Sequence, residues 1–254
     1  MISKYELKRF ARAQKLTLHQ QEQHYIQTAI IQGIYISIAN ELIFKGGTAL
    51  FFFYGLNRFS EDLDFTKTKN VAIKKLQSTV SDVLYMLNIQ HNLKTILTPA
   101  GITIRVKTQG PLYSEPLSTT TVKIDISERN DVVKPPDIKE IVPIYNDLRP
   151  ITIPVMDIQE ILAEKIRAII TRGKARDMYD IAFLLKKGFK LKQELIDKKL
   201  EYYNTSFESN KFSTQIKAIK SIWKAELQGL VPIMPVFEDE ASFILNYFKK
   251  HYSK

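Results

Sequence analysis

Hydrophobic and polar positions in the first part of the chain switch between the period of an α-helix and that of a β-strand. Apolar residues three to four apart predict helices over residues 3–15, 18–41, 48–54 and 71–87. Alternation at every second residue predicts strands over residues 42–45, 58–66, 95–97, 102–107 and 121–127, with one more extended piece in "RPITIPVM" (149–156).

From Asp157 onwards the strand pattern disappears. Helical spacing continues through residues 157–171, 175–187, 193–203, 213–227 and 238–251. A mixed part followed by a purely helical part predicts an α+β fold, with a first domain over residues 1–154 and a helical second domain over residues 155–254.

The composition is that of a globular protein with substantial cores, because 44% of the 254 residues are hydrophobic and 11% aromatic. No apolar run reaches the roughly 20 residues that a membrane span needs, and the N-terminal segment lacks the apolar core of a secretory signal. The absence of cysteine excludes disulfides and thiolate chemistry and fits a cytoplasmic protein. Four scattered histidines without metal-ligand spacing argue against a zinc site.

Charge is the first indication of function. The chain has 37 lysine and arginine residues against 27 acidic residues, a net charge of +10 and a pI near 9.5, which favours polyanionic partners such as nucleic acids or nucleotides. Two basic groups stand out, the helical stripe Lys4, Lys8, Arg12 and Lys15 and the cluster Lys186, Lys187, Lys190 and Lys192. Each could contact the phosphates of an RNA or be a solvated face, and no RNA-recognition motif is present.

The segment "FKGGTALFFFYGLNRFSEDLDFTK" (44–67) places two carboxylates on one strand. Side chains at positions i and i+2 of a strand point to the same face, with Cα atoms about 7 Å apart. Asp62 and Asp64 therefore converge. Asp125 alternates out of phase with its neighbouring isoleucines in "TVKIDIS" (121–127), and we expect it to reach the same face from an adjacent strand.

Carboxylates this close repel each other unless a cation lies between them, and Mg²⁺ is bound by oxygen ligands of this kind. Three carboxylates on adjacent strands can hold two metal ions about 3.5–4 Å apart, as in displacement reactions at phosphorus. We therefore predict that Asp62, Asp64 and Asp125 bind Mg²⁺, as two ions. An isolated D-x-D pair is more often a solvated strand or a turn cap, but here a glycine turn precedes it.

That turn predicts a phosphate site. Gly46 and Gly47 allow the backbone to approach a phosphate closely, and Thr48 can cap the helix that follows. Backbone amides at a helix start form an anion site. The three residues alone are also compatible with a simple turn.

Lys165 falls within the apolar face of the helix predicted over residues 157–171. A buried ammonium needs an anionic partner, and a nucleoside triphosphate, Asp64 or Asp177 could each serve, unless the lysine reaches solvent at the domain edge. On the next helix, Asp177 and Asp180 could orient Lys165 and Arg172 or approach an acceptor hydroxyl. A structural arginine–aspartate clamp that joins Arg176 to Asp177 is an equally supported interpretation.

Four pieces of the sequence, taken together, resemble the AbiEii/AbiGii-type nucleotidyltransferase family, whose members include toxins of toxin–antitoxin and phage-defence systems such as the MenT toxins. They are "FKGGTAL" (44–50), "RFSEDLDF" (58–65), "VKIDIS" (122–127) and "EILAEKIRAIITRGKARDMYDIAFLL" (160–185). Their joint occurrence in this order is specific, whereas any one piece is not. The terminal helices lie outside the resemblance.

The resemblance implies a nucleotidyltransferase fold of the DNA polymerase β-like type, followed by a helical domain that completes the active-site cleft. It implies metal ligands at Asp62, Asp64 and Asp125 and catalytic roles for Asp64, Asp125, Lys165 and Asp177. Nucleotide binding is expected at Gly46, Gly47, Thr48, Arg58 and Lys165.

These observations predict Mg²⁺-dependent transfer of a nucleotide from a nucleoside triphosphate to an RNA acceptor, with release of pyrophosphate. By resemblance, the acceptor is the 3′ end of transfer RNA and the protein is a toxin, with a possible cognate antitoxin. Three alternatives remain open: modification of a protein or small-molecule hydroxyl, a non-catalytic nucleic-acid-binding module, and a metal-dependent phosphodiesterase.

Overall fold

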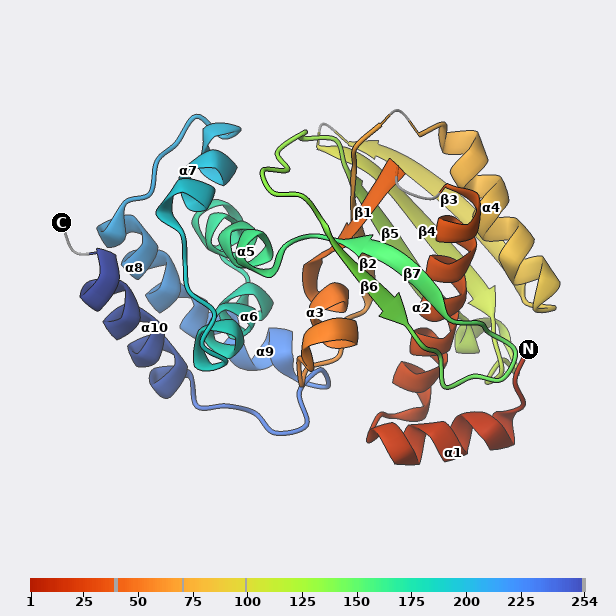
Figure 1. Ribbon diagram of the computed structural model, residues 1–254. Helices are drawn as coiled ribbons and strands as arrows, with labels where there is room; N and C mark the ends of the chain where they lie inside the picture. The colour runs from red at the N-terminus through yellow and green to blue at the C-terminus, as the bar shows by residue number, and fades with distance from the viewer. Residues whose placement is uncertain (39–40, 70, 99, 253–254) are drawn as a thin grey trace. The chain divides into compact units, whose positions relative to one another are not determined.

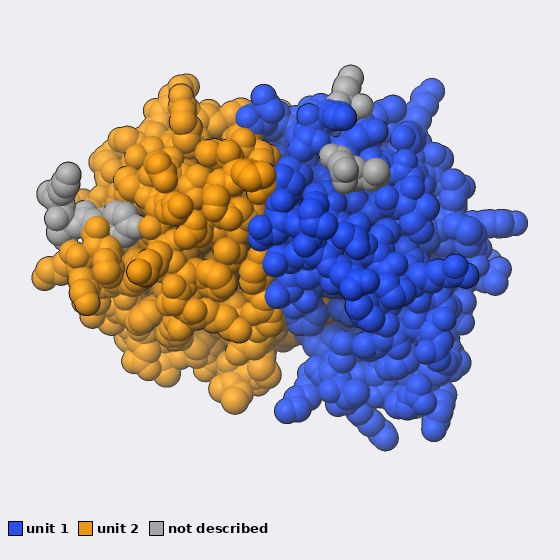
Figure 2. All heavy atoms as spheres, viewed as in Figure 1, with its two compact units in different colours: residues 1–53, 60–130, 136–155 blue, residues 54–59, 131–135, 156–254 orange. Residues whose placement is uncertain are grey.

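The computed structural model describes residues 1–38, 41–69, 71–98 and 100–252 (Figure 1). Contacts divide the chain into the two compact units coloured in Figure 2. Unit 1 comprises residues 1–53, 60–130 and 136–155, and unit 2 comprises residues 54–59, 131–135 and 156–254. The chain thus passes into unit 2 twice through short segments, 54–59 and 131–135, and returns to unit 1 each time. It enters unit 2 for the last time at residue 156, next to the domain boundary predicted after residue 154.

Among the described residues, one mixed sheet of seven strands forms the centre of unit 1, in the order β3-β4-β5-β2-β1-β7-β6. The strands are β1 (Leu42–Lys45), β2 (Asp62–Lys67), β3 (Gln90–Thr98), β4 (Gly101–Gln109), β5 (Thr120–Ser127), β6 (Asp137–Ile141) and β7 (Ile151–Val155). The central strand β2 runs antiparallel to β1 and parallel to β5. A 3₁₀ turn, Pro116–Ser118, precedes β5.

One face of this sheet is a continuous apolar surface. Leu63, Ile104 and Ile124 lie opposite one another on β2, β4 and β5, and none of them is accessible to solvent. Each such side chain contributes about 1.5–3 kcal/mol by burial. Because side chains alternate along a strand, the positions between these residues project from the other face.

Helices α2 (Leu18–Ser37) and α4 (Ile73–Met86) contact each other and the sheet (Figure 1). Their close approach requires Gly33, because a Cβ atom there would lie 2.8 Å from Cγ1 of Val83. Helix α1 (Lys4–Gln14) precedes α2, and α3 (Gly46–Tyr54) follows β1 directly. Capping boxes at Ser3 and Thr17 satisfy the first amides of α1 and α2, which explains why both helices begin where the pattern predicts.

Unit 2 is helical. Its helices are α5 (Ile158–Arg172), α6 (Ala175–Lys186), α7 (Gln193–Glu201), α8 (Ser209–Ala218), the 3₁₀ turn Ile219–Ile222, α9 (Trp223–Leu227) and α10 (Phe237–Tyr252). Asp157 caps α5 by accepting from the amides of Gln159 and Glu160, and Gly173 ends it with a left-handed φ of +59°. No helix in the described part of the chain combines the length and apolarity that a membrane span requires.

The α+β class is confirmed, but several details of the predicted elements are wrong. The strand predicted over 95–97, for example, extends over Gln90–Thr98. Strand β6 escapes prediction because it is an edge strand without regular alternation, in which Ile138 is exposed and Ile141 is the one buried residue. The helix predicted over residues 213–227 is two helices joined by a 3₁₀ turn. The strand predicted from residue 58 begins at Asp62, because the Gln27 side chain donates to the carbonyls of Ser60 and Glu61. The end of the helix predicted over 18–41 includes residues 39 and 40, which lie outside the described residues.

Candidate functional site

The strand registers bring three predicted carboxylates to one face of the sheet. Asp64 of β2 lies opposite Asp125 of β5, and Asp62 lies opposite Lys123. Opposed residues of neighbouring strands project from the same face, as do positions i and i+2 of one strand. Asp62, Asp64, Asp125 and Lys123 therefore share the face opposite the apolar one, and all four are half-buried.

Lys123 is the counter-ion of this carboxylate group. Its Nζ pairs with Asp125 Oδ2, while Thr103 Oγ1 donates to Asp125 Oδ1 at 2.5 Å. Partial burial lowers the pKa of Lys123. The hydrogen bond to Asp125 and the negative charges of Asp62, Asp125 and Asp64 raise this pKa by a larger amount, so the net shift is upward. The lysine ammonium thus stays charged among the three aspartates.

Lys45 joins the same face from β1, opposite Asp64, and is only 5% exposed. Neither Lys45 nor Lys123 is among the predicted site residues. Both have a signal in the sequence, because Lys123 precedes Asp125 by two residues and Lys45 is the last residue of a buried strand directly before the glycine pair. Strand periodicity is the pattern that identifies them.

Gly46 lies against the carboxylate of Asp64. Its φ of +72° is in the left-handed region that favours glycine, and a Cβ atom there would lie 2.1 Å from Oδ2 and 2.8 Å from Cβ of Asp64. Backbone conformation and space therefore both require glycine. The glycine turn and the carboxylate face form one local arrangement within unit 1.

Thr48 connects the first turn of α3 to the residues before β2. Its buried Oγ1 lies 2.8 Å from Ser60 Oγ and donates to the backbone carbonyl of Asp62. These contacts make Thr48 a positioning residue for the strand that carries Asp62 and Asp64. Its role in nucleotide binding stays a prediction.

The three aspartates have the donor chemistry that suits Mg²⁺, since all their ligand atoms are carboxylate oxygens. Across the described ranges of the chain, no group of three or more histidine, cysteine, aspartate or glutamate side chains is gathered closely enough to hold a metal ion. Asp125 is instead directed to Lys123 and Thr103. The three aspartates suit the ion because their ligand atoms are carboxylate oxygens and they project from one face of the sheet. For all three to bind one ion, Asp125 would have to exchange its ion pair with Lys123 for the metal.

A buried ionic network in unit 2 contains the predicted Lys165 and Asp177. Lys165 Nζ lies 2.9 Å from Asp177 Oδ1 and 2.8 Å from Asp180 Oδ2, and all three side chains are buried. Burial lowers the pKa of Lys165, but Asp177 and Asp180 outweigh it, so the pKa is raised and the lysine stays charged. Of the anionic partners predicted for Lys165, the structure shows Asp177, joined by Asp180.

Arg172 forms an arginine–aspartate clamp from the last turn of α5 to the first turn of α6. Its Nε and one terminal nitrogen donate to the two oxygens of Asp177 at 2.9 and 3.1 Å. Burial raises the pKa of Asp177, yet the charges of Lys165 and Arg172 dominate and lower it to about 2. Asp177 is therefore a buried, ionised carboxylate shared by two cations.

Arg58 belongs to the segment 54–59 of unit 2 and donates to both oxygens of Asp180, each at 2.7 Å. A third nitrogen donates to the carbonyl of Phe59 at 3.0 Å, and the residue is 2% exposed. This bidentate, buried pair fixes the segment to α6. The contact between Arg58 and phosphate that the sequence predicts stays a prediction.

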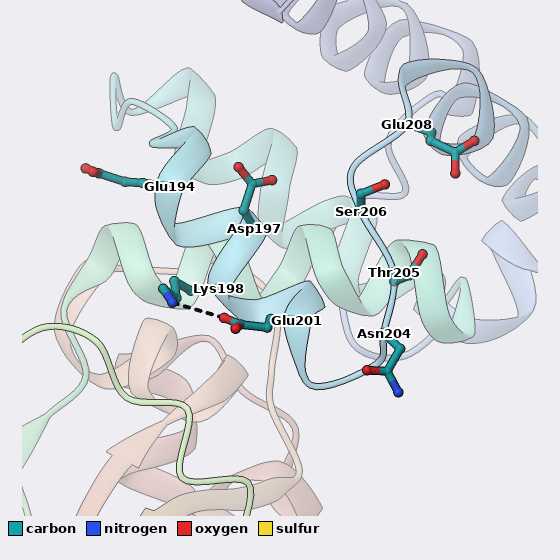
Figure 3. A pocket seen from close by; sticks show the side chains of 8 residues that line it. All are labelled: Glu194, Asp197, Lys198, Glu201, Asn204, Thr205, Ser206 and Glu208. Atoms are coloured by element: carbon teal, nitrogen blue, oxygen red, sulfur yellow. Dashed lines mark hydrogen bonds and ion pairs between the residues drawn. The ribbon is translucent and has the colours of Figure 1, made fainter.

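A hollow of about 810 Å³ on α7 and the segment after it contains none of the predicted site residues (Figure 3). Four carboxylates line it, those of Glu194, Asp197, Glu201 and Glu208. The Lys198 ammonium that lies among them pairs with Glu201 at 3.0 Å. The surplus of negative charge repels phosphate groups, so this hollow is unsuited to a nucleotide.

Several solved structures share the fold, among them one from Helicobacter pylori and one from Mycobacterium tuberculosis. JHP933 from Helicobacter pylori is 23% identical, with a TM-score of 0.62 over 91% of this chain and 90% of that one. MenT4, a nucleotidyltransferase toxin from Mycobacterium tuberculosis H37Rv, is 16% identical, with a TM-score of 0.69 over 98% of this chain and 89% of that one. The predicted nucleotidyltransferase fold is thereby confirmed. No curated protein matches the sequence.

The sequence profile described as "Nucleotidyl transferase AbiEii toxin, Type IV TA system" matches residues 36–244. This range includes the glycine turn, the carboxylate face and the ionic network of unit 2. The resemblance inferred from four short motifs is therefore confirmed, and so is the enzyme class. The chain belongs to the AbiEii family of nucleotidyltransferase toxins of type IV toxin–antitoxin systems.

Proposed function

We propose that this nucleotidyltransferase uses Mg²⁺ to transfer a nucleoside monophosphate from a nucleoside triphosphate to a hydroxyl of RNA, at the 3′ end of transfer RNA. The observation that supports this most is the shared sheet face of Asp62, Asp64 and Asp125, directly beside the backbone of Gly46. A phosphodiesterase would use the same carboxylates but leaves the glycine turn without a role.

In the proposed reaction, the acceptor oxygen bonds to the α-phosphorus, the bond to the β-phosphate breaks, and pyrophosphate leaves while the hydroxyl proton passes to solvent. Asp62, Asp64 and Asp125 would hold the metal, which when bound would neutralise triphosphate charge and make the acceptor hydroxyl more acidic. Gly46, Gly47 and Thr48 receive the phosphates on the backbone at the start of α3. Positioning and electrostatics supply most of the rate.

Lys165 and Asp177 keep the catalytic roles that their motif suggests, and Lys165 and Arg58 keep the predicted roles in nucleotide binding. Within unit 2, Asp177 holds Lys165 in the ammonium form that a phosphate-binding lysine needs. Arg58 and Asp180 keep the segment 54–59 in place.

The RNA acceptor is supported by the net charge of +10, because a small-molecule acceptor has no need of a strongly basic protein. Membership of a type IV toxin family supports a cytoplasmic toxin that has a cognate antitoxin and acts in growth control or phage defence. Nucleotidylation of a protein or a small molecule is the second candidate, favoured only by the absence of an RNA-recognition motif.

The test is incubation of the purified protein with each of the four labelled nucleoside triphosphates, Mg²⁺ and total cellular extract, followed by location of the label. We expect label in the transfer RNA fraction, at the 3′ end. Label in protein or in a small molecule would show that this molecule, and not RNA, is the acceptor. Labelled mononucleotide without transfer would indicate hydrolysis. Asp64→Ala and Lys165→Ala should each abolish incorporation, and full activity in either variant would refute that residue's role.

A further inference from the structure

A row of basic side chains without acidic partners runs along α1. Lys4, Lys8, Arg12 and Lys15 are exposed and lie three or four residues apart, on one face of the helix. Within the part of the chain that the structure describes, none of these four side chains forms an ion pair. The row also lies outside residues 36–244, the range that the family profile matches.

The row borders a hollow. Lys8, Arg12 and Lys15 line a cavity of about 380 Å³ whose remaining lining is apolar, from Ala11, Leu16 and Leu18. The acidic residue of α1, Glu6, is not part of this lining, because its carboxylate accepts from the amide and hydroxyl of Ser3 at the other end of the helix. The hollow thus has a cationic rim and an apolar floor.

The second basic group, on α6 and the residues after it, is different. Lys186 Nζ lies 2.6 and 2.7 Å from the two oxygens of Glu240, so its charge is neutralised within the protein. Lys187 lies over the ring of Phe183 at 5.2 Å. The sequence alone leaves the two groups equal as phosphate contacts, whereas these pairings favour the group on α1.

We infer that the groove formed by Lys8, Arg12, Lys15 and the apolar floor between them binds the sugar-phosphate backbone of the RNA acceptor. This inference rests on the proposed function. Positions four residues apart are about 6 Å apart along the helix axis, and an evenly spaced row of cations suits a polymer with evenly spaced charges. Arg12 can bind a phosphate through two nitrogens, and the floor can receive a ribose or a base.

The row carries an electrostatic cost that RNA binding relieves. Three or four like charges on one helix face repel one another, and each phosphate that pairs with one of them releases a condensed counterion from the RNA. Charge removal at the groove should therefore weaken binding and also reduce its dependence on salt. A partner bound by hydrogen bonds or apolar contacts alone would show the first effect without the second.

The experiment compares Lys8→Gln/Arg12→Gln/Lys15→Asn with Lys187→Gln/Lys190→Gln/Lys192→Gln, a control that removes the same net charge. Asparagine is chosen at position 15 because the φ of +56° there is left-handed. Fluorescence anisotropy measures binding of a labelled transfer RNA transcript to the full chain over a range of salt, without nucleoside triphosphate. Circular dichroism and thermal melting establish that all proteins are folded.

We expect the α1 variant to bind at least about ten-fold more weakly at physiological salt and to lose about two units of the slope of log affinity against log salt, as for three phosphate contacts. The control should keep affinity and slope within about two-fold of wild type. Equal losses in the two variants would show that net charge, not the groove, carries binding. Unchanged RNA affinity in the α1 variant would overturn the inference. If the α1 variant kept its RNA affinity but lost binding to an acidic protein, the groove would be assigned to a protein partner.

The inference and the proposed function can fail separately. If the wild type transfers a nucleotide to RNA and the α1 variant does so with an unchanged KM for the RNA, the groove assignment is wrong and the proposed function stands. If the label goes to another acceptor while RNA binding still depends on the groove, the groove assignment stands and RNA is not the acceptor of the proposed reaction.

Discussion

At the scale of single residues, the glycine turn and the carboxylates proposed to bind the metal depend on one another. Gly46 has a left-handed φ, and its Cα has no room for a side chain because Asp64 lies against it. A residue often explained by turn geometry alone is here also a spacer that lets a carboxylate lie against the backbone at the start of a helix. The proposed phosphate cradle and the proposed metal ligand therefore cannot vary independently.

Gly46→Ala should reduce nucleotidyl transfer by about 100-fold or more, because Asp64 must move and misplacement of a catalytic group by about 1 Å has effects of that size. Gly188→Ala is the matched control, since Gly188 also has a positive φ, of +86°, but nothing lies within 4 Å of the added Cβ. Both variants carry a backbone cost of about 1–2 kcal/mol. Equal activity of the two variants in the transfer assay would show that contact with Asp64 is unimportant.

Lys123 occupies the electrostatic position that a metal ion is proposed to take. Lys123→Gln should therefore bind Mg²⁺ more tightly, by about ten-fold, because the ion no longer competes with an ammonium for Asp125. Isothermal titration calorimetry of metal binding to the full chain measures this directly. Lys107→Gln, an exposed lysine on the neighbouring β4, removes the same charge and should leave the affinity near wild type. Weaker binding in Lys123→Gln would contradict competition.

At the scale of elements, α5 and α6 are joined by charges as well as by apolar contacts. Asp180 has no accessible surface and serves both Arg58 and Lys165. Removal of one member of a buried ionic network is costly because its partners remain charged without compensation. The stability of unit 2 and the position of the segment 54–59 therefore depend on this one carboxylate.

Asp180→Asn should lower the free energy of unfolding by about 3–5 kcal/mol, since two buried cations lose their shared counter-ion. Urea denaturation followed by circular dichroism measures the change. Asp197→Asn, which removes a carboxylate from the exposed side of α7, should change stability by less than about 0.5 kcal/mol. A small effect at position 180 would mean that the network contributes little to folding.

Helix α2 contains a buried histidine that makes stability depend on pH. His24 stacks on Phe52 and its Nδ1 lies 2.7 Å from the hydroxyl of Tyr145. Burial lowers its pKa from 6.5 to about 4. Between these values the unfolded chain binds a proton that the folded chain does not, so this contribution to stability is complete above the unfolded pKa and is lost as the pH falls towards the folded one.

Wild type should therefore lose roughly 2 kcal/mol more stability between about pH 7 and pH 4.5 than His24→Gln does. Urea denaturation at both pH values gives the two differences, and comparison of differences cancels the direct effect of the substitution. His19→Gln, at an exposed histidine, should retain the wild-type dependence. Parallel losses in wild type and His24→Gln would exclude His24 as the group responsible.

At the scale of the whole molecule, the chain combines the fold of a nucleotidyltransferase toxin with a net charge of +10. If the proposed acceptor is correct, induced expression of wild type in a host without an antitoxin should arrest growth, because transfer RNA with an added nucleotide at its 3′ end cannot be aminoacylated. Asp64→Ala at equal soluble protein level should not. Equal arrest by both proteins, measured as colony counts after induction, would separate the growth effect from nucleotide transfer.

Much of this molecule follows from sequence pattern. Strand β1 is predicted at its observed limits, and α1, α5, α6 and α10 to within two residues. The reason is that the capping residues of α1 and α5 and the apolar periods of all four helices are local signals. Strand β6 and the break between α8 and α9 are missed, since an edge strand buries one face at most and a 3₁₀ turn keeps a nearly helical spacing.

What the sequence determines by itself is the chemistry available. The residue types, their spacing and their order identify the family and the candidate carboxylates. What only the tertiary structure decides is which charges meet. The register of β2 against β5 sets Lys123 among the aspartates. The contact between α5 and α6 pairs Lys165 with Asp177 and Asp180, and the packing of segment 54–59 against α6 pairs Arg58 with Asp180. Ion pairing depends on distance in space, and partners such as Arg58 and Asp180 are 122 residues apart in the chain.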